Sequence, residues 1–193
     1  MGKSITKEEI ADFDVEEFPG KIYLINNPVD ARKAVRYLSQ FKFLGFDTET
    51  RPSFTKGLLH STSLIQIATF DTCFLFRLSE SGFPSSLIDL LSNPEILKIG
   101  LSLKDDFMSM SRLLKFSPQG FIDLQKIVQK HDIEDLSLQK IYAILFRKKI
   151  SKTQRLSNWD AEKLSEAQKK YAALDAWACL KIYEYLCLTK KYI

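Results

Sequence analysis

The sequence predicts an α/β fold built on one mixed sheet that is flanked by helices. Three short apolar segments follow one another between residues 43 and 76, and a three-residue turn joins the last two, which is typical of antiparallel strands. After residue 84, segments of strand length alternate with segments of helical periodicity, which implies crossover connections and parallel strands. At 193 residues, 45% of them hydrophobic, the chain is long enough for one domain with a substantial core.

The first half of the chain predicts a leader, a strand, a helix and three further strands. Residues 1–20 hold two lysines and six acids with little apolar pattern, so we expect an acidic, loosely ordered leader ahead of a single domain over residues 21–193. Residues 21–25 alternate as a short strand. Asn27 and Pro28 start a helix that reaches residue 39, with Asn27 as its cap. Strands follow over residues 43–49, 63–68 and 73–76.

The second half predicts helices that alternate with two strands. The predicted helices cover residues 84–91, 103–115 and 124–130, and the strands cover residues 96–99 and 121–123. Leu138, Ile141 and Leu145 lie on one face of a further helix. Ser165 and Gln168 form a capping box at the start of the final helix, which reaches residue 188. No repeat or low-complexity linker divides the chain.

Cysteine and histidine usage excludes several classes of protein. Cys73, Cys179 and Cys187 lack paired or metal-binding spacing, so we expect no disulfide framework and a reducing, cytoplasmic environment. His60 and His131 are the only histidines and do not show the spacing of a zinc site. The first ten residues are polar and no later segment is apolar enough to span a bilayer, so we expect a soluble protein without membrane association.

A basic segment precedes the final helix, although the net charge of the chain is only +4. No acid occurs between Asp135 and Asp160, and six basic residues do. Such a segment can bind phosphates, while a solvated basic loop is the structural alternative. Its position just before the last acidic motif favours phosphate binding. The candidate phosphate contacts are Lys148, Lys149, Lys152 and Arg155.

Three fragments carry carboxylates where a metal site could use them. Asp47 and Glu49 stand two apart at the end of an apolar strand, so both side chains leave the same face. Neighbouring carboxylates repel each other unless a cation lies between them. The second fragment, residues 100–106, ends in Asp105 and Asp106. In the third, Asp175 lies one helical turn after a tyrosine.

Each fragment alone also has a structural interpretation, either as an exposed strand end or as a tyrosine packed in the core. Together and in this order, they resemble the DEDDy branch of the 3′-to-5′ exonuclease superfamily, which includes the Werner syndrome exonuclease domain and, more distantly, RNase D. The resemblance spans residues 20–188. It includes residues 64–68, which are similar to the family's second strand, and residues 156–159 and 164–176, which are similar to the approach to its third motif.

The resemblance implies a ribonuclease H-like fold and a 3′-to-5′ exonuclease that uses two divalent metal ions. Oxygen ligands without Cys or His suit Mg²⁺ or Mn²⁺. In the family, the acid of the second motif stands six residues after a glycine that ends a strand. Counted from Gly100, this position is Asp106 rather than Asp105. In place of Ser102 the family often has Gly or Asn. The implied metal ligands are Asp47, Glu49, Asp106 and Asp175, and the implied water-orienting residue is Tyr171.

The expected partner is the 3′ end of a nucleic acid. Thr48, Phe54 and Leu58 are further candidates for contacts with it, the last two by stacking on terminal bases. We expect Asp123 to cap a helix and Trp159 to pack beneath the final helix. The resemblance to Werner-type domains implies DNA as the favoured substrate, as a single strand or a recessed end, and the lack of an accessory helical domain like that of RNase D in this sequence argues against transfer-RNA trimming. The alternatives are an exoribonuclease and an inactive nucleic-acid-binding module with the same fold.

Overall fold

The computed structural model of the chain describes residues 2–53, 55 and 59–188. Its centre is a six-stranded sheet in the order β1-β4-β3-β2-β5-β6. β2, β3 and β4 pair antiparallel, whereas β1 pairs parallel with β4, β5 with β2, and β6 with β5. This confirms the predicted mixed sheet. The strands are β1 (Lys21–Ile25), β2 (Phe43–Thr50), β3 (Thr62–Ala68), β4 (Thr72–Arg77), β5 (Leu97–Gly100) and β6 (Phe121–Asp123).

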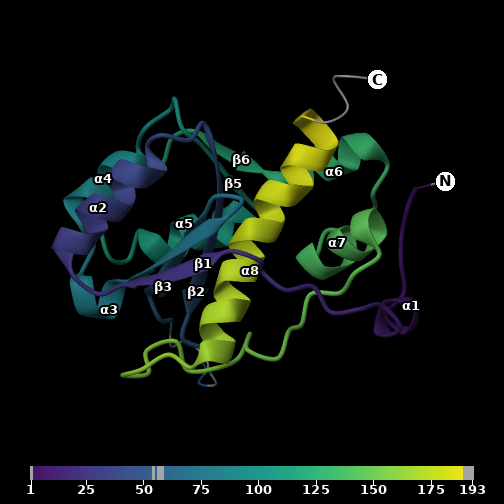
Figure 1. Cartoon of the computed structure of the whole chain (residues 1–193), viewed down its shortest axis with the longest axis horizontal. Coiled ribbons are helices and arrows are strands. Elements are labelled where there is room, and N and C mark those ends of the chain that lie inside the picture. The colour runs from purple at the N-terminus through teal and green to yellow at the C-terminus, as the bar shows by residue number, and fades with distance from the viewer. Residues whose placement is uncertain (1, 54, 56–58, 189–193) are drawn as a thin grey trace.

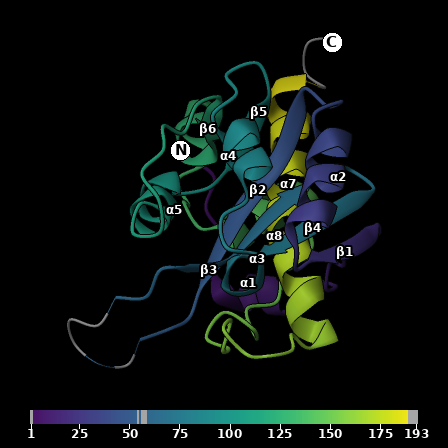
Figure 2. The same cartoon turned by 90° about the vertical axis from the view of Figure 1, so that its left-hand side faces the viewer.

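Helices cover both faces of the sheet (Figures 1 and 2), and each face has its own buried core. α2, α4 and α5 pack with Phe46 and Ile67 on one face. α6, α7 and the long α8 pack with Leu64 and Ile99 on the other. The helices are α1 (Lys7–Ala11), α2 (Pro28–Leu38), α3 (Leu78–Ser81), α4 (Ser85–Leu91), α5 (Leu103–Met110), α6 (Leu124–Val128), α7 (Leu138–Phe146) and α8 (Glu166–Tyr183).

Helix ends follow the predicted caps more closely than the predicted lengths. Asn27 accepts a hydrogen bond from the Asp30 backbone N–H at the start of α2, and Ser165 and Gln168 form the capping box of α8. α5 ends at Met110 rather than at residue 115. Leu113, in the following turn, is 42% exposed, so the apolar stripe that holds α5 against the sheet has ended there. A π-helical turn, Glu184–Leu188, follows α8.

Residues 1–20, for which the sequence predicts a loosely ordered leader, contain the short helix α1 and pack against α7. Thr6 and Glu9 form a capping box at the start of α1, so this short helix begins at a defined residue. Ile5 and Ile10 are buried with Ala143 of α7 in a small core of their own. The two isoleucines supply the apolar anchor that the acidic composition of the segment conceals.

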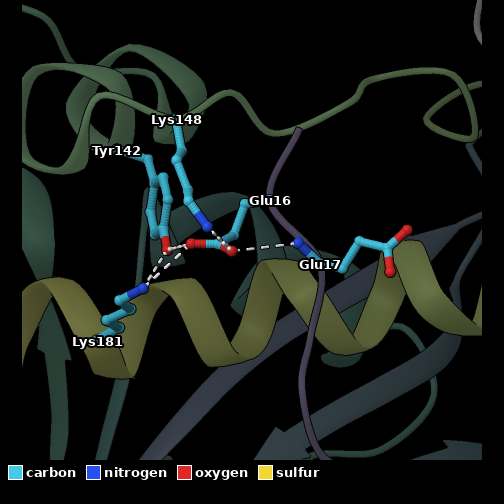
Figure 3. Close-up of polar contacts among 5 residues, drawn as sticks. All are labelled: Glu16, Glu17, Tyr142, Lys148 and Lys181. Carbon is cyan, nitrogen blue, oxygen red and sulfur yellow. Dashed lines mark hydrogen bonds and ion pairs between the residues drawn. The ribbon is translucent and has the colours of Figure 1, made fainter. Parts of the chain in front are cut away.

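Glu16 fastens the same segment to the domain (Figure 3). Its side chain is 9% exposed and accepts hydrogen bonds from the Tyr142 hydroxyl at 2.6 Å, Lys148 Nζ at 2.9 Å and Lys181 Nζ at 3.1 Å. The ammonium group of Lys181 also lies 4.5 Å from the ring centroid of Trp177. Burial raises the pKa of Glu16, but the three hydrogen bonds outweigh burial and lower it to about 2. Glu16 is therefore a buried carboxylate that remains ionised.

A buried lysine braces the opposite face of the sheet. Lys98 on β5 has no exposed surface, and its Nζ donates to the carbonyl oxygens of Leu90, Asn93 and Ile96. Three donors for three carbonyls satisfy the ammonium group completely. The side chain thus ties the end of α4 to the start of β5.

Cys73 and Cys179 are buried, and Cys187 is partly buried. Among the described residues, no disulfide joins Cys73, Cys179 or Cys187. No helix in the described ranges combines the length and the apolarity that crossing a bilayer requires.

Candidate active site

Three of the predicted carboxylates meet above the end of β2. Asp47 and Glu49 leave the same face of that strand, and Asp175 reaches them from α8. One carboxylate oxygen from each lies within 4.8 Å of the others. Asp175 is 6% exposed and Glu49 is 9% exposed, so the group is largely removed from water.

Gly45 sets the distance between the strand and the helix that carry these acids. It precedes Asp47 by two positions and therefore faces α8 as well. A Cβ added to Gly45 would lie 2.0 Å from the carbonyl oxygen of Ala176, which is the residue after Asp175. Only glycine permits this backbone contact, so the approach of α8 to β2 depends on the missing side chain.

Asp106 approaches the group from α5. Its charge is close enough to raise the pKa of Asp47, and its carboxylate accepts a hydrogen bond from the Thr48 hydroxyl. Asp106 is not one of the three acids whose oxygens lie within 4.8 Å of one another. Thr48, a predicted nucleic-acid contact, thus uses its hydroxyl to hold Asp106. Asp105 is exposed and lines a different hollow beside Arg112.

Asp123 holds the turn that leads into α5. Asp123 is the predicted helix cap, and one of its carboxylate oxygens accepts a hydrogen bond from the backbone N–H of Gln125. The same side chain also accepts hydrogen bonds from the N–H groups of Ser102 and Leu103. Ser102 has φ 59° and ψ 39°, which is left-handed backbone. This conformation favours Gly or Asn, and the cap from Asp123 offsets its cost here. Asp123 therefore aligns the start of the helix that carries Asp106.

Tyr171 lies beside Asp175, one turn earlier on α8. Its hydroxyl interacts with the Asp175 carboxyl, and its ring centroid lies 6.1 Å from that of Trp159. Trp159 is 1% exposed and belongs to the core beneath α8, as predicted. Burial and the negative charge of Asp175 raise the pKa of Tyr171, so its hydroxyl keeps its proton and acts as a hydrogen-bond donor.

The carboxylates repel one another in the absence of a cation. Burial raises the pKa of all four acids, and the charges of neighbouring acids raise those of Asp47 and Glu49 further. The Oδ1 atom of Asp175 is buried without a hydrogen-bond partner among the described residues. A close set of buried oxygen ligands with an unsatisfied oxygen fits a divalent cation such as Mg²⁺ or Mn²⁺.

The predicted phosphate contacts separate into two groups. Lys152 and Arg155 lie near the acids. The charge of Lys152 lowers the pKa of Asp175, and the charge of Arg155 lowers the pKa of Glu49. Lys148 instead pairs with Glu16, and Lys149 Nζ donates to the Ala11 carbonyl at 2.6 Å. Lys148 and Lys149 thus contact the N-terminal segment. Phe54 and Leu58, the predicted stacking residues, lie outside the described residues.

Sequence reasoning missed the side chain that anchors the loop before α8. Arg77, at the end of β4, is 3% exposed and donates from its two terminal nitrogens to the carbonyl oxygens of Ala161 and Glu162. These carbonyls lie between Trp159 and the start of α8. In the sequence, Arg77 directly follows an apolar segment and has no acid next to it. That pattern is the signal for a buried guanidinium that donates to backbone carbonyls.

Comparison with known proteins gives a family for this arrangement. A model of the 3′-5′ exonuclease family matches residues 23–189. The chain is 32% identical over 180 residues to the bifunctional 3′-5′ exonuclease/ATP-dependent helicase WRN of Mus musculus, over 88% of this chain and 13% of that protein. It is 31% identical over 163 residues to a 3′-5′ exonuclease of Arabidopsis thaliana, over 77% of this chain and 54% of the relative. The chain thus spans only part of either relative.

Solved structures show the same fold. The EXO domain of Aedes aegypti Nibbler superposes with a TM-score of 0.76 at 20% identity, over 96% of this chain and 90% of that one. Escherichia coli RNase D superposes with a TM-score of 0.77 at 21% identity, over 88% of this chain and 45% of that one. These likenesses confirm the predicted ribonuclease H-like arrangement of the sheet and helices. With the family model covering residues 23–189, the chain belongs to the 3′-5′ exonuclease family.

Proposed function

We propose that this chain hydrolyses nucleic acid from its 3′ end with the help of two divalent metal ions, and that DNA is its preferred substrate. The observation that carries the proposal is the meeting of Asp47, Glu49 and Asp175 within 4.8 Å in a buried position. Asp106 is the proposed fourth ligand, with its carboxylate oriented by the hydroxyl of Thr48. Divalent ions held by these residues would supply activation of the attacking water and neutralisation of charge on the phosphate and the leaving oxygen.

The remaining roles belong to side chains around the acids. Tyr171 keeps its proton, so we assign it to hold and orient the attacking water by a hydrogen bond rather than to remove a proton from it. Lys152 and Arg155 face the acids and are suited to hold the phosphates of the terminal nucleotides. Lys148 and Lys149, which contact the N-terminal segment, are weaker candidates for this contact.

The choice of DNA follows the sequence resemblance to Werner-type exonuclease domains, and the chain is 32% identical to the WRN protein of mouse. RNA is the alternative substrate. It is favoured by the structural likeness to RNase D of Trypanosoma brucei, which was crystallised with RNA U12 and superposes with a TM-score of 0.77.

The decisive experiment measures the shortening of a 5′-labelled strand with Mg²⁺ or Mn²⁺. Asp175→Asn removes one proposed metal ligand. Because metal ions stabilise a transition state by several kcal/mol, the rate should fall by about a hundredfold or more. Asp106→Asn should do the same. The matched control is Asp105→Asn, which removes the adjacent exposed acid and should retain the wild-type rate. An Asp175→Asn protein as active as wild type would refute the proposal.

The same assay separates the alternatives. Matched DNA and RNA strands, single and duplexed, identify the preferred sugar. Strands that bind but are never shortened, whichever divalent ion is present, would favour an inactive binding module.

Binding measurements test the phosphate contacts. Lys152→Glu and Arg155→Glu should weaken binding to all sequences alike and reduce its salt dependence. Lys33→Glu, on α2 at the other face of the sheet, is the control and should leave affinity unchanged.

A further inference from the structure

A glutamine in the middle of the sheet has no partner for its side chain. Gln66 lies on β3 with no exposed surface, and neither Nε2 nor Oε1 of its amide has a hydrogen-bond partner among the described residues. Each buried polar atom left in this way destabilises a fold. A methionine or leucine would fill a similar space without that cost. The amide therefore needs an explanation beyond packing.

Its position in the strand ladder provides one. Gln66 is the residue directly opposite Asp47 in the antiparallel pairing of β3 with β2. Directly opposite residues project from the same face of a sheet, with Cβ atoms about 4.5–5.5 Å apart. Gln66 therefore lies on the same face as Asp47 and Asp175. Its neighbours on that face of β3 are Leu64 and Ala68, which are apolar and belong to the core beneath α8.

The acid opposite Gln66, Asp47, is one of the proposed metal ligands. A carboxylate that binds a metal is usually oriented by a hydrogen bond from a further side chain, and loss of that partner weakens metal binding by about 10–100-fold. Among the described residues, the Thr48 hydroxyl supplies such a bond to Asp106, and the Tyr171 hydroxyl interacts with Asp175. The amide of Gln66 can supply the equivalent donor for Asp47.

We propose that Gln66 is a positioning residue for the metal site, whose amide nitrogen donates a hydrogen bond to the Asp47 carboxylate when divalent cations are bound. The assignment rests on the proposed function. With the cations bound, Asp47 would accept from Nε2 of Gln66, which is one of the two amide atoms that lack a partner among the described residues.

The test separates metal binding from folding by titrating Mn²⁺ into the metal-free protein in a calorimeter. Gln66→Met keeps the length of the side chain and removes the amide, and Gln66→Leu is a second variant in case the first does not fold. The metal-free variant should unfold at the same temperature as wild type or higher, because the unpaired amide is gone. Its Mn²⁺ affinity should fall by about 10–100-fold.

The matched control is Ile67→Val on the neighbouring position of β3, whose side chain is buried in the core on the other face. It should lower stability and leave Mn²⁺ affinity unchanged. Wild-type Mn²⁺ affinity in the folded Gln66 variant, together with lost binding in Asp175→Asn, would overturn the role of Gln66 alone. A wild-type protein that binds no Mn²⁺ would overturn the proposed function and this inference together.

Discussion

Replacement of Glu16 by glutamine should destabilise the protein near neutral pH and have little effect near pH 2. The carboxylate of Glu16 accepts hydrogen bonds from Tyr142, Lys148 and Lys181, which together lower its pKa from 4.5 to about 2. A carboxyl whose pKa is lower in the folded than in the unfolded protein stabilises the fold above the unfolded pKa. That contribution is lost as the pH falls through the folded pKa.

The size of the effect follows from the shift of the pKa. A drop from 4.5 to about 2 corresponds to roughly 3 kcal/mol of folding free energy above pH 4.5. The side chains of Lys148 and Lys181 are 45% and 29% exposed, so solvent screening reduces the expected loss in Glu16→Gln to roughly 2 kcal/mol. Most of the difference between wild type and variant should disappear between pH 4.5 and pH 2.

The assay is urea unfolding at constant ionic strength over this pH range, with the free energy of unfolding compared at each pH. Glu17→Gln is the matched control, because Glu17 is the adjacent acid and is exposed (Figure 3). It should leave the pH profile of stability unchanged. If Glu16→Gln and Glu17→Gln show the same stability at pH 7, the argument for a buried, ionised anchor is refuted.

Substitutions at three further residues test other parts of the structure. Arg77→Met removes the donors to two backbone carbonyls of the loop before α8. It should weaken nucleic-acid binding, measured by fluorescence anisotropy, more than it lowers kcat, and should cost about 2 kcal/mol of stability in urea. Ser102→Gly relieves left-handed backbone and should raise the unfolding free energy by about 1 kcal/mol, whereas Ser102→Val should lower it. Lys98→Met leaves three buried carbonyls without their donor and should lower the thermal midpoint, with a loss of roughly 3 kcal/mol in urea.

Features that depend on neighbouring residues could be predicted from the sequence. The Asn27 cap and the capping box of Ser165 and Gln168 lie where the sequence places them, because each is formed within four residues of chain. The alternation of strands and helices gave the mixed sheet for a similar reason. The two-residue spacing of Asp47 and Glu49 predicted that both would leave one face of a strand.

Features that depend on distant residues could not be predicted in this way. Glu16 meets Tyr142 and Lys181, which lie 126 and 165 positions further along the chain, so its sequence neighbours suggest only a solvated acidic segment. Lys148 is likewise distant in the sequence from its partner Glu16. The residues around Lys148 therefore showed only a basic segment that could bind phosphate. The left-handed backbone of Ser102 is equally hidden, because serine carries no signal for it and the supporting cap comes from Asp123.

The contact over Gly45 also shows that the spacing of the acids depends on a residue that carries no functional group. Backbone touches backbone there, so any side chain at residue 45 would push α8 away from β2 and separate Asp175 from Asp47. A substitution that leaves every carboxylate in place can therefore still take the cluster apart.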